Sequence, residues 1–218
     1  MPRQINLASL AAEPGITAAS FLLLIAYHIL LNLYRRTHPG KGTHARHAST
    51  RDAWVRRMLQ ENQGILAVQT LRNWTMASSF LASTAILLGL ALLNLLLASN
   101  QTGIARLAAM ADLCADTAIP PKLLLISANF FFAFFNFTMA IRFYNHSGFM
   151  ITPPLAPAPQ EDVNEVINTV NRAAFHYTLG MRGYYMAVPL GLWLLGPSWL
   201  LAGTVLVIGT LWYADQTG

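Results

Sequence analysis

The sequence predicts an all-α, polytopic membrane protein with four transmembrane helices and additional cytoplasmic amphipathic helices. Of its 218 residues, 55% are hydrophobic and only 11% are charged, against roughly 25% charged residues in a soluble domain. Apolar runs long enough to cross a bilayer recur along the chain, and the basic residues gather beside them. The length accommodates about four spans of ~20 residues and no separate soluble catalytic domain. We therefore expect residues 1–218 to form a single membrane domain.

The first apolar run, ITAASFLLLIAYHILLNLY, predicts a span over about residues 15–34. A cleaved signal peptide would carry positive charge before the apolar run. Here one arginine precedes the run, whereas Arg35, Arg36 and Lys41 follow it. This pattern favours an uncleaved first span.

The stretch from Arg51 to Ala98 is predicted to be the central helical element of the chain. It begins as a basic cytoplasmic helix over about 50–68, in which Trp54 and Met58 can face lipid, and it continues into a second span over about 70–98. A polar loop that carries Cys114 follows. Because this is the single cysteine of the chain, an internal disulfide and a cysteine-based zinc or iron–sulfur site are excluded.

The second half of the chain predicts two more spans and one more surface helix. A phenylalanine-rich run predicts a span over about 122–144, and the segment TPPLAPAPQ is too rich in proline for regular structure. An amphipathic helix is expected over about 160–180, because apolar residues recur there at helical spacing. The last span is predicted over about 184–212, with Pro189 and Pro197 as kink points.

The distribution of basic residues predicts the orientation. Eleven of the 14 Lys and Arg residues lie between positions 35 and 72 or between 142 and 182. Because basic residues concentrate on the cytoplasmic side of membrane proteins, we expect both termini outside the cytoplasm, in the inner membrane if the source is bacterial. Basic residues beside spans indicate anionic phospholipid as a partner. Nucleic acid is not expected, because there is no basic soluble module to bind it.

Seven polar residues in or near the predicted spans are candidate ligand-binding residues. Gln69, Arg72 and Asn73 form one stripe of the second span, where Arg72 could hold an anion or lipid headgroup, reach the headgroups itself, or join interhelical hydrogen bonds. Asn129 and Asn136 share one face of the third span, as a packing seam or a polar pathway. Arg142 and Arg182 add positive charge near the cytoplasmic side.

Histidines offer a weaker alternative site. Paired histidines on facing helices can bind haem or a metal, and His28, His146 and His176 are the candidates. No two of them lie in one span at ligand spacing, so such a site would have to assemble between helices. Motifs for hydrolases, nucleotide phosphate binding and zinc peptidases are absent from the sequence. We therefore expect no catalytic residues, no enzyme activity and no cofactor.

Four strings in the chain resemble a known family. YHILLNLYRRTHPG, WVRRMLQENQGILAVQTLRNWTMASSFLASTAILL, FNFTMAIRFYNHSGFMI and GMRGYYMAVPLGLWLLGPSWL are similar to domain-of-unknown-function family 599, a four-span membrane family of bacteria and plants. The resemblance covers about residues 27–213. It implies a four-span fold and places eight residues in the family's typical strings: His28, Arg35, Gln69, Thr70, Arg72, Asn73, Arg142 and Arg182. It implies no particular activity.

The sequence thus leaves three functions open. The first is an oligomeric channel or transporter for a small anionic or neutral solute, because the spans carry Arg and Asn but no acidic residue. The second is an accessory or assembly subunit of a larger membrane complex. The third is a haem-binding membrane redox protein. Four helices enclose little room for a pore, so a homo-oligomer or partner membrane subunits are expected.

Overall fold

The computed structural model describes residues 7–37, 43–97, 119–151 and 160–217, and this part of the chain is helical without strands. Its elements are α1 (Leu7–Thr37), α2 (Thr43–Gln60), α3 (Gly64–Leu97), α5 (Ile119–Ile151), α6 (Gln160–Leu192), the short 3₁₀ helix η1 (Trp193–Leu195) and α7 (Pro197–Thr217). The all-α prediction is confirmed. Cys114 and the proline-rich segment lie outside the described residues.

Three helices in the described part are long and apolar enough to cross a membrane. They are the stretch Pro14–Leu31 of α1, then α3 and α5, and they coincide with the first three predicted spans. With 34 and 33 residues, α3 and α5 are each about 50 Å long at 1.5 Å per residue, which exceeds the ~30 Å hydrocarbon core of a bilayer. The apolar stretch Pro197–Tyr213 is shorter.

The predicted fourth span, 184–212, is divided between two helices. Helix α6 ends at Leu192 and α7 begins at Pro197, with Gly196 between them at φ 135°. That backbone conformation is open to glycine and strained for other residues. The α-carbon of Gly203 lies so close to Pro189 that an added Cβ would be 3.0 Å from the Pro189 Cα. The chain therefore folds back on itself here and does not continue through a kink.

The predicted continuous helix through residues 51–98 is also interrupted, after Gln60. Asn62 adopts φ 54°, the Gln63 amide donates to the Met58 carbonyl at 2.9 Å, and the Asn62 amide donates to the Leu59 carbonyl at 3.3 Å. This pair of hydrogen bonds around one left-handed residue is the Schellman motif that ends helices. The surface helix is therefore α2, over residues 43–60 and not 50–68, and it can pack at an angle to α3.

The chain divides into two compact units, each with its own contacts. In the first unit (1–42, 91–127 and 185–218), α1 packs beside α7. Trp193 packs edge-on against Phe21, and the Lys122 ammonium lies 5.2 Å from the Trp193 ring centre. These contacts join η1 to α1 and α5.

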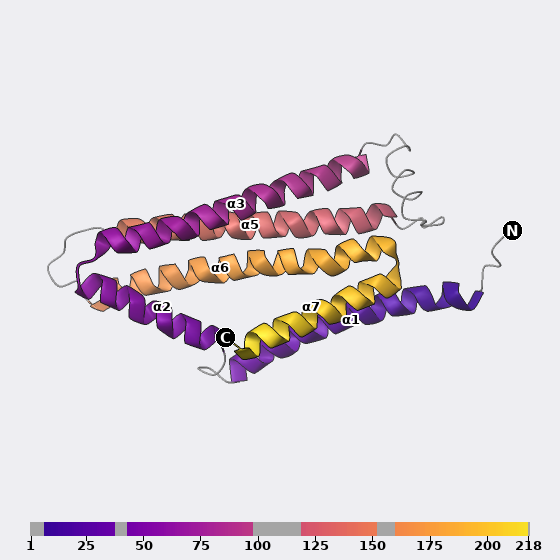
Figure 1. Ribbon diagram of the computed structural model, residues 1–218, viewed down its shortest axis with the longest axis horizontal. Coiled ribbons are helices and arrows are strands. Elements are labelled where there is room, and N and C mark those ends of the chain that lie inside the picture. The colour runs from indigo at the N-terminus through magenta and orange to yellow at the C-terminus, as the bar shows by residue number, and fades with distance from the viewer. Residues whose placement is uncertain (1–6, 38–42, 98–118, 152–159, 218) are drawn as a thin grey trace. The chain divides into compact units, whose positions relative to one another are not determined.

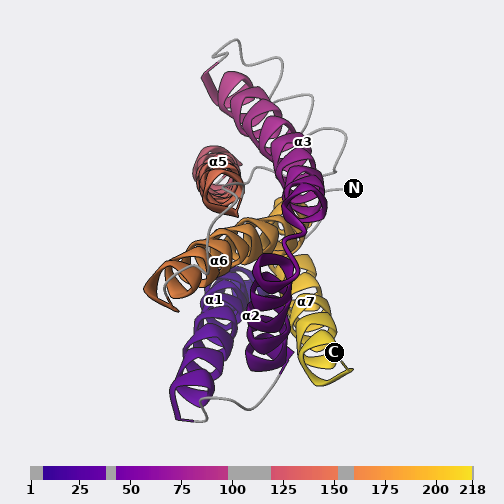
Figure 2. The same cartoon turned by 90° about the vertical axis from the view of Figure 1, so that its left-hand side faces the viewer.

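The second unit (43–90 and 128–184) holds α2 and the adjoining parts of α3, α5 and α6. The α3, α5 and α6 segments lie side by side, and α2 closes one end of them (Figures 1 and 2). The core at this end contains residues of all four helices, among them Val55 and Met58 of α2, Leu71 of α3, Ala140 of α5 and Val170 of α6. Met58 is thus buried in protein, although the sequence suggested that it faces lipid.

Candidate functional site

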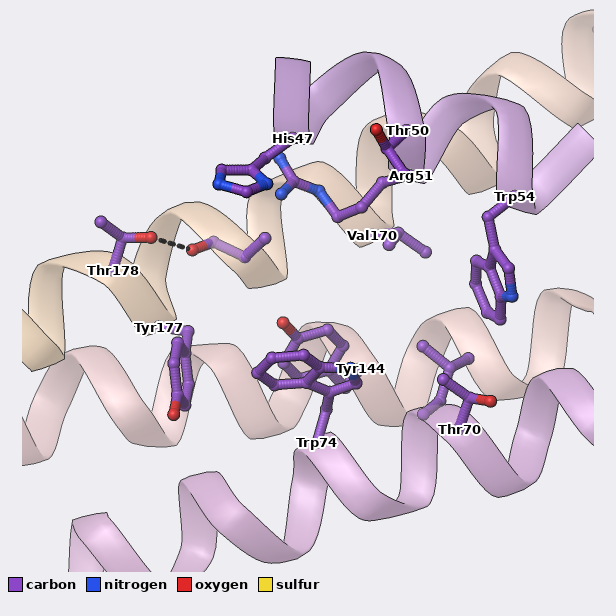
Figure 3. A pocket seen from close by; sticks show the side chains of 12 residues that line it. His47, Thr50, Arg51, Trp54, Thr70, Trp74, Tyr144, Val170, Tyr177 and Thr178 are labelled. Carbon is purple, nitrogen blue, oxygen red and sulfur yellow. Dashed lines mark hydrogen bonds between the residues drawn. The ribbon is translucent and has the colours of Figure 1, made fainter. Parts of the chain in front are cut away.

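A cavity of about 490 Å³ lies in the second unit, among α2, α3, α5 and α6. Its volume falls within the ~300–1,000 Å³ typical of small-molecule sites. The lining comes from all four helices: His47, Thr50, Arg51, Trp54, Thr70, Leu71, Trp74, Tyr144, Val170, Ala174, Tyr177 and Thr178. Figure 3 shows Arg51 and His47 on one side of it and the rings of Trp74 and Tyr144 on the opposite side. This cavity is the candidate functional site.

Helix α2 is placed over the cavity by its two faces. The apolar face buries Val55 and Met58, and burial of such side chains stabilises the docked helix by about 1.5–3 kcal/mol each. The polar face makes hydrogen bonds to α6, because the Arg56 guanidinium donates to Asn164 at 3.1 Å and Arg51 donates to Asn171 at 2.9 Å. These contacts fix which residues of α2 point into the cavity.

Arg51 is held in a short polar chain that runs from α2 to α6 and back. Its Nε donates to the Asn171 Oδ1 at 2.9 Å, and the Asn171 Nδ2 donates to the Asp52 carboxylate at 2.7 Å. Burial lowers the pKa of Arg51 from its ordinary value, while Tyr144 and Asp52 oppose this effect. The guanidinium stays charged, since the ordinary pKa of arginine lies far above neutral pH. Asn171 therefore holds the partly desolvated positive charge of Arg51 at the cavity.

Aromatic side chains supply much of the remaining wall, one from each helix: Trp54, Trp74, Tyr144 and Tyr177. Trp74 stacks on Tyr144 with ring centres 6.3 Å apart, and it meets Tyr177 edge-on at 5.4 Å. Tyr177 in turn packs against Phe137. The rings of α3, α5 and α6 thus brace one another, which gives the cavity a preformed apolar surface.

Three threonines line the cavity, and each hydroxyl donates to a carbonyl of its own helix. Thr50 bonds to Arg46 at 2.9 Å, Thr70 to Leu66 at 3.0 Å, and Thr178 to Ala174 at 2.8 Å. A hydroxyl has one proton to donate, so these three groups can only accept from a ligand. The described residues that line the cavity include no acidic side chain. The threonine oxygens, as acceptors, do not help to bind an anion, and it is the Arg51 guanidinium beside the aromatic walls that suits the cavity to an anion with an apolar body.

The predicted stripe Gln69, Arg72 and Asn73 lies elsewhere. All three side chains are exposed, and none lines the cavity. Thr70 and Trp74 of the same segment do line it. A ligand role for the stripe stays a prediction, and its exposure shows that these residues do not form a polar core within this chain.

Asn129 and Asn136 connect α5 to α6. The Asn129 Nδ2 donates to the Gly183 carbonyl at 2.8 Å, and buried Asn136 donates to the Phe132 carbonyl at 2.9 Å and lies 3.0 Å from the His176 Nδ1. Both amides thus contact α6, as a packing seam requires, and a polar pathway along them stays a prediction. Arg142 is exposed and Arg182 is half-buried, and neither lines the cavity.

The histidines form no common site in the described part of the chain. The His28 Nδ1 lies 2.8 Å from the Leu24 carbonyl of its own helix, His146 is exposed, and His176 stacks on Phe143. Within the described residues no group of three or more His, Cys, Asp or Glu could hold a metal ion. Haem or metal binding by these histidines stays a prediction without geometric support.

Sequence reasoning missed the residues that form the cavity. Arg51 was counted only as a basic surface residue, and Trp54 was expected to face lipid. A recognisable pattern was present, since His47, Arg51 and Trp54 recur at spacings of four and three on α2. Thr70 and Trp74 are likewise four residues apart on α3. Such spacings place side chains on one face of a helix, but they do not say which helices meet.

The described part of the chain is thus all-helical, with long apolar helices of the kind found in membrane proteins and a ligand-sized cavity in its second unit. The family model described as "Protein of unknown function, DUF599" matches residues 16–218. The chain belongs to this family, as the resemblance in sequence implied. Comparison with curated proteins and with solved structures gave no match.

Proposed function

We propose that this protein is a multi-span membrane transporter for a small anionic solute and that the cavity of the second unit is its substrate site. The observation that carries the proposal is the position of Arg51, which is fixed by Asn171 and lines a ligand-sized cavity. Where the structure describes the lining of this cavity, it holds no acidic side chain. Positive charge in a poorly solvated site attracts anions more strongly than it does in water. A transporter needs such a site, and a structural subunit does not.

Reconstituted liposomes test the proposal. The purified protein should catalyse uptake of radiolabelled benzoate, acetate or lactate above the rate of protein-free vesicles. Arg51→Gln should lower uptake at least tenfold, because a hydrogen bond to a charged group contributes about 1.5–3 kcal/mol. The matched control is Arg57→Gln on the same helix, where the native side chain is 73% exposed and pairs with Glu61. Absence of uptake for all three anions, or equal uptake by the two variants, would refute the proposal.

The proposed orientation has α2 on the cytoplasmic face and both termini outside. Exposed Arg46 and Arg57 of α2 would then meet anionic phospholipid headgroups, each worth about 1 kcal/mol. Labelling with a membrane-impermeant maleimide tests this arrangement, because Cys114 is the single cysteine. It should be modified in intact cells. A cysteine placed at Glu61 in a Cys114→Ser background should react only after permeabilisation, and the opposite pattern would invert the topology.

A second candidate function, a subunit of an assembly, is favoured by the exposed stripe of Gln69, Arg72 and Asn73. Polar side chains in membrane spans usually face protein and not lipid, so a second copy or another subunit would cover this stripe. Mild-detergent purification followed by mass measurement should give a complex larger than one chain. Gln69→Leu combined with Asn73→Leu should dissociate it. A monomer of the wild-type protein in both detergent and lipid nanodiscs would count against this candidate.

A further inference from the structure

The charge in the cavity limits what the ligand can carry. Among the described residues that line the cavity, Arg51 is the one permanent cation, and Asn171 links it to the Asp52 carboxylate. Its Nε is committed to Asn171, while Figure 3 shows the rest of the guanidinium on the cavity side, extending toward His47. Paired guanidinium nitrogens match the two oxygens of a carboxylate. The described lining thus offers one guanidinium to one carboxylate of the ligand, whereas a second carboxylate would need another cation.

The walls limit the body of the ligand. Trp54, Trp74, Tyr144 and Tyr177 each come from a different helix, so a bound molecule meets aromatic surface around much of its circumference. Aromatic rings pack best on other flat rings, offset or edge-on. The hydroxyls of Thr50, Thr70 and Thr178 have already donated their protons. These three oxygens can still accept from a ligand, but the aromatic walls offer few partners to the remaining hydroxyls of a sugar, so a polyhydroxylated body would lose hydrogen bonds on entering.

The volume limits the size. About 490 Å³ accommodates a substituted ring with a short acidic arm, since sites of this order hold single drug-sized molecules. Two acyl chains of a phospholipid exceed it. A bare inorganic anion would leave the aromatic surface without a partner.

We infer that the ligand of this cavity is an aromatic monocarboxylate, bound with its carboxylate on Arg51 and its ring among Trp54, Trp74 and Tyr177. This inference rests on the proposed function for the identity of the site, and it adds the chemical class of the substrate. The Tyr144 hydroxyl, which Figure 3 shows on the side that faces Arg51, is placed to donate to the same carboxylate.

Equilibrium binding with small probes tests the class independently of transport. Dissociation constants of the purified full-length protein are measured by thermal shift and by tryptophan fluorescence for benzoate, benzyl alcohol, acetate and inorganic phosphate. We expect benzoate to bind at least tenfold more tightly than each of the other three. Benzyl alcohol keeps the ring without the charge, and acetate keeps the charge without the ring.

Two variants connect the binding to the cavity. Arg51→Gln should weaken benzoate binding at least tenfold, and Trp74→Leu should weaken it severalfold while acetate binding stays unchanged. Trp212→Leu is the matched control, because Trp212 is an exposed tryptophan of α7 and its loss should leave the benzoate affinity intact. If Arg51→Gln fails to fold, Arg51→Lys keeps the charge without the planar fork and should show an intermediate affinity.

The outcomes separate this inference from the proposed function. Phosphate or acetate binding as tightly as benzoate, or benzyl alcohol matching it, overturns the aromatic carboxylate, as does binding of none of the four probes. Benzoate binding that needs Arg51 without any uptake into liposomes supports the ligand class and overturns the transporter. Uptake of acetate that needs Arg51, with benzoate neither bound nor taken up, supports the transporter and overturns the ligand class.

Discussion

The Asn171 Oδ1 of α6 accepts a hydrogen bond from the Arg51 Nε of α2 at 2.9 Å. The same amide donates to the Asp52 carboxylate at 2.7 Å, so one neutral side chain holds two opposite charges of the neighbouring helix. An amide suits this position because it offers both an acceptor and a donor. The contact ties the α2 wall of the cavity to α6 and sets the direction of the guanidinium.

Substitutions at Asn171 and Asp52 test whether this hydrogen-bonded bridge stabilises the fold. Asn171→Asp keeps the acceptor for Arg51 but places two carboxylates together, and we expect it to lower the free energy of unfolding by about 1–2 kcal/mol. Adding Asp52→Asn restores a donor opposite the new carboxylate and should recover most of the loss. Thermal unfolding in detergent measures this as a drop of roughly 2–8 °C and its reversal. Equal melting temperatures for the single and double variants would show that the bridge has no energetic role.

The turn that orients α2 depends on Asn62 at φ 54°. Left-handed backbone costs most L-residues roughly 1–2 kcal/mol, and asparagine and glycine tolerate it best. We therefore expect Asn62→Gly to keep the stability of the wild-type protein and Asn62→Ala to lower it by about 1 kcal/mol. Gln60→Ala, at an exposed helical position of α2, is the control and should be neutral. Denaturation curves compare the four proteins, and a neutral Asn62→Ala would contradict the role of the turn.

Hydrophobic periodicity in the sequence correctly predicted that the segments are helical. It did not predict the helix boundaries that single residues set. The apolar pattern of 51–98 continues past Asn62, because a left-handed residue changes the direction of the chain without changing its hydropathy. The same is true of Gly196, next to the predicted kink point Pro197, where the structure has a reversal. Backbone conformation at such positions depends on the hydrogen bonds that follow, which the hydrophobic pattern does not record.

The candidate site was less predictable than the fold for a related reason. Arg72 stands out in sequence because it interrupts an apolar run, yet α3 turns it outward and buries Ala67 and Leu71. Arg51 lies in a polar, basic helix, so its charge does not distinguish it in the sequence from the other arginines there. Its importance arises from the meeting of four helices, and single-helix spacing identifies a face without naming the partner. A site assembled from separate helices is therefore visible only once their packing is known.

The seam between α5 and α6 depends on two glycines. An added Cβ at Gly180 would lie 2.8 Å from the Phe137 ring, and one at Gly183 would lie 2.9 Å from the Ala133 Cβ. Gly180→Ala and Gly183→Ala should each destabilise the protein by about 1–3 kcal/mol through overpacking. Gly148→Ala on α5 is the control, because nothing lies within 4 Å of its added Cβ. Thermal unfolding measures the melting temperatures of the three variants. Equal melting temperatures would show that the packing between α5 and α6 can adjust to the added methyl groups.

His176 should make stability depend on pH. Its Nδ1 lies 3.0 Å from the buried Asn136 Oδ1 and its ring stacks on Phe143. Burial, and then the neighbouring Arg172 charge, lower the pKa of His176 below its ordinary value of 6.5. The unfolded chain therefore binds a proton at a higher pH than the folded protein does, and the sign of the linkage follows from this difference.

Stability from His176 is fully present above about pH 6.5 and is lost as the pH falls from there through the lower folded pKa. Melting temperatures between pH 8 and pH 5 should thus decrease more steeply for the wild-type protein than for His176→Gln, which keeps an amide donor for Asn136 but does not titrate. His146→Gln, at an exposed position of α5, should keep the wild-type slope. A His176→Gln slope equal to the wild-type slope would mean that other groups carry the acid sensitivity. The bond to Asn136 would then be a packing contact only.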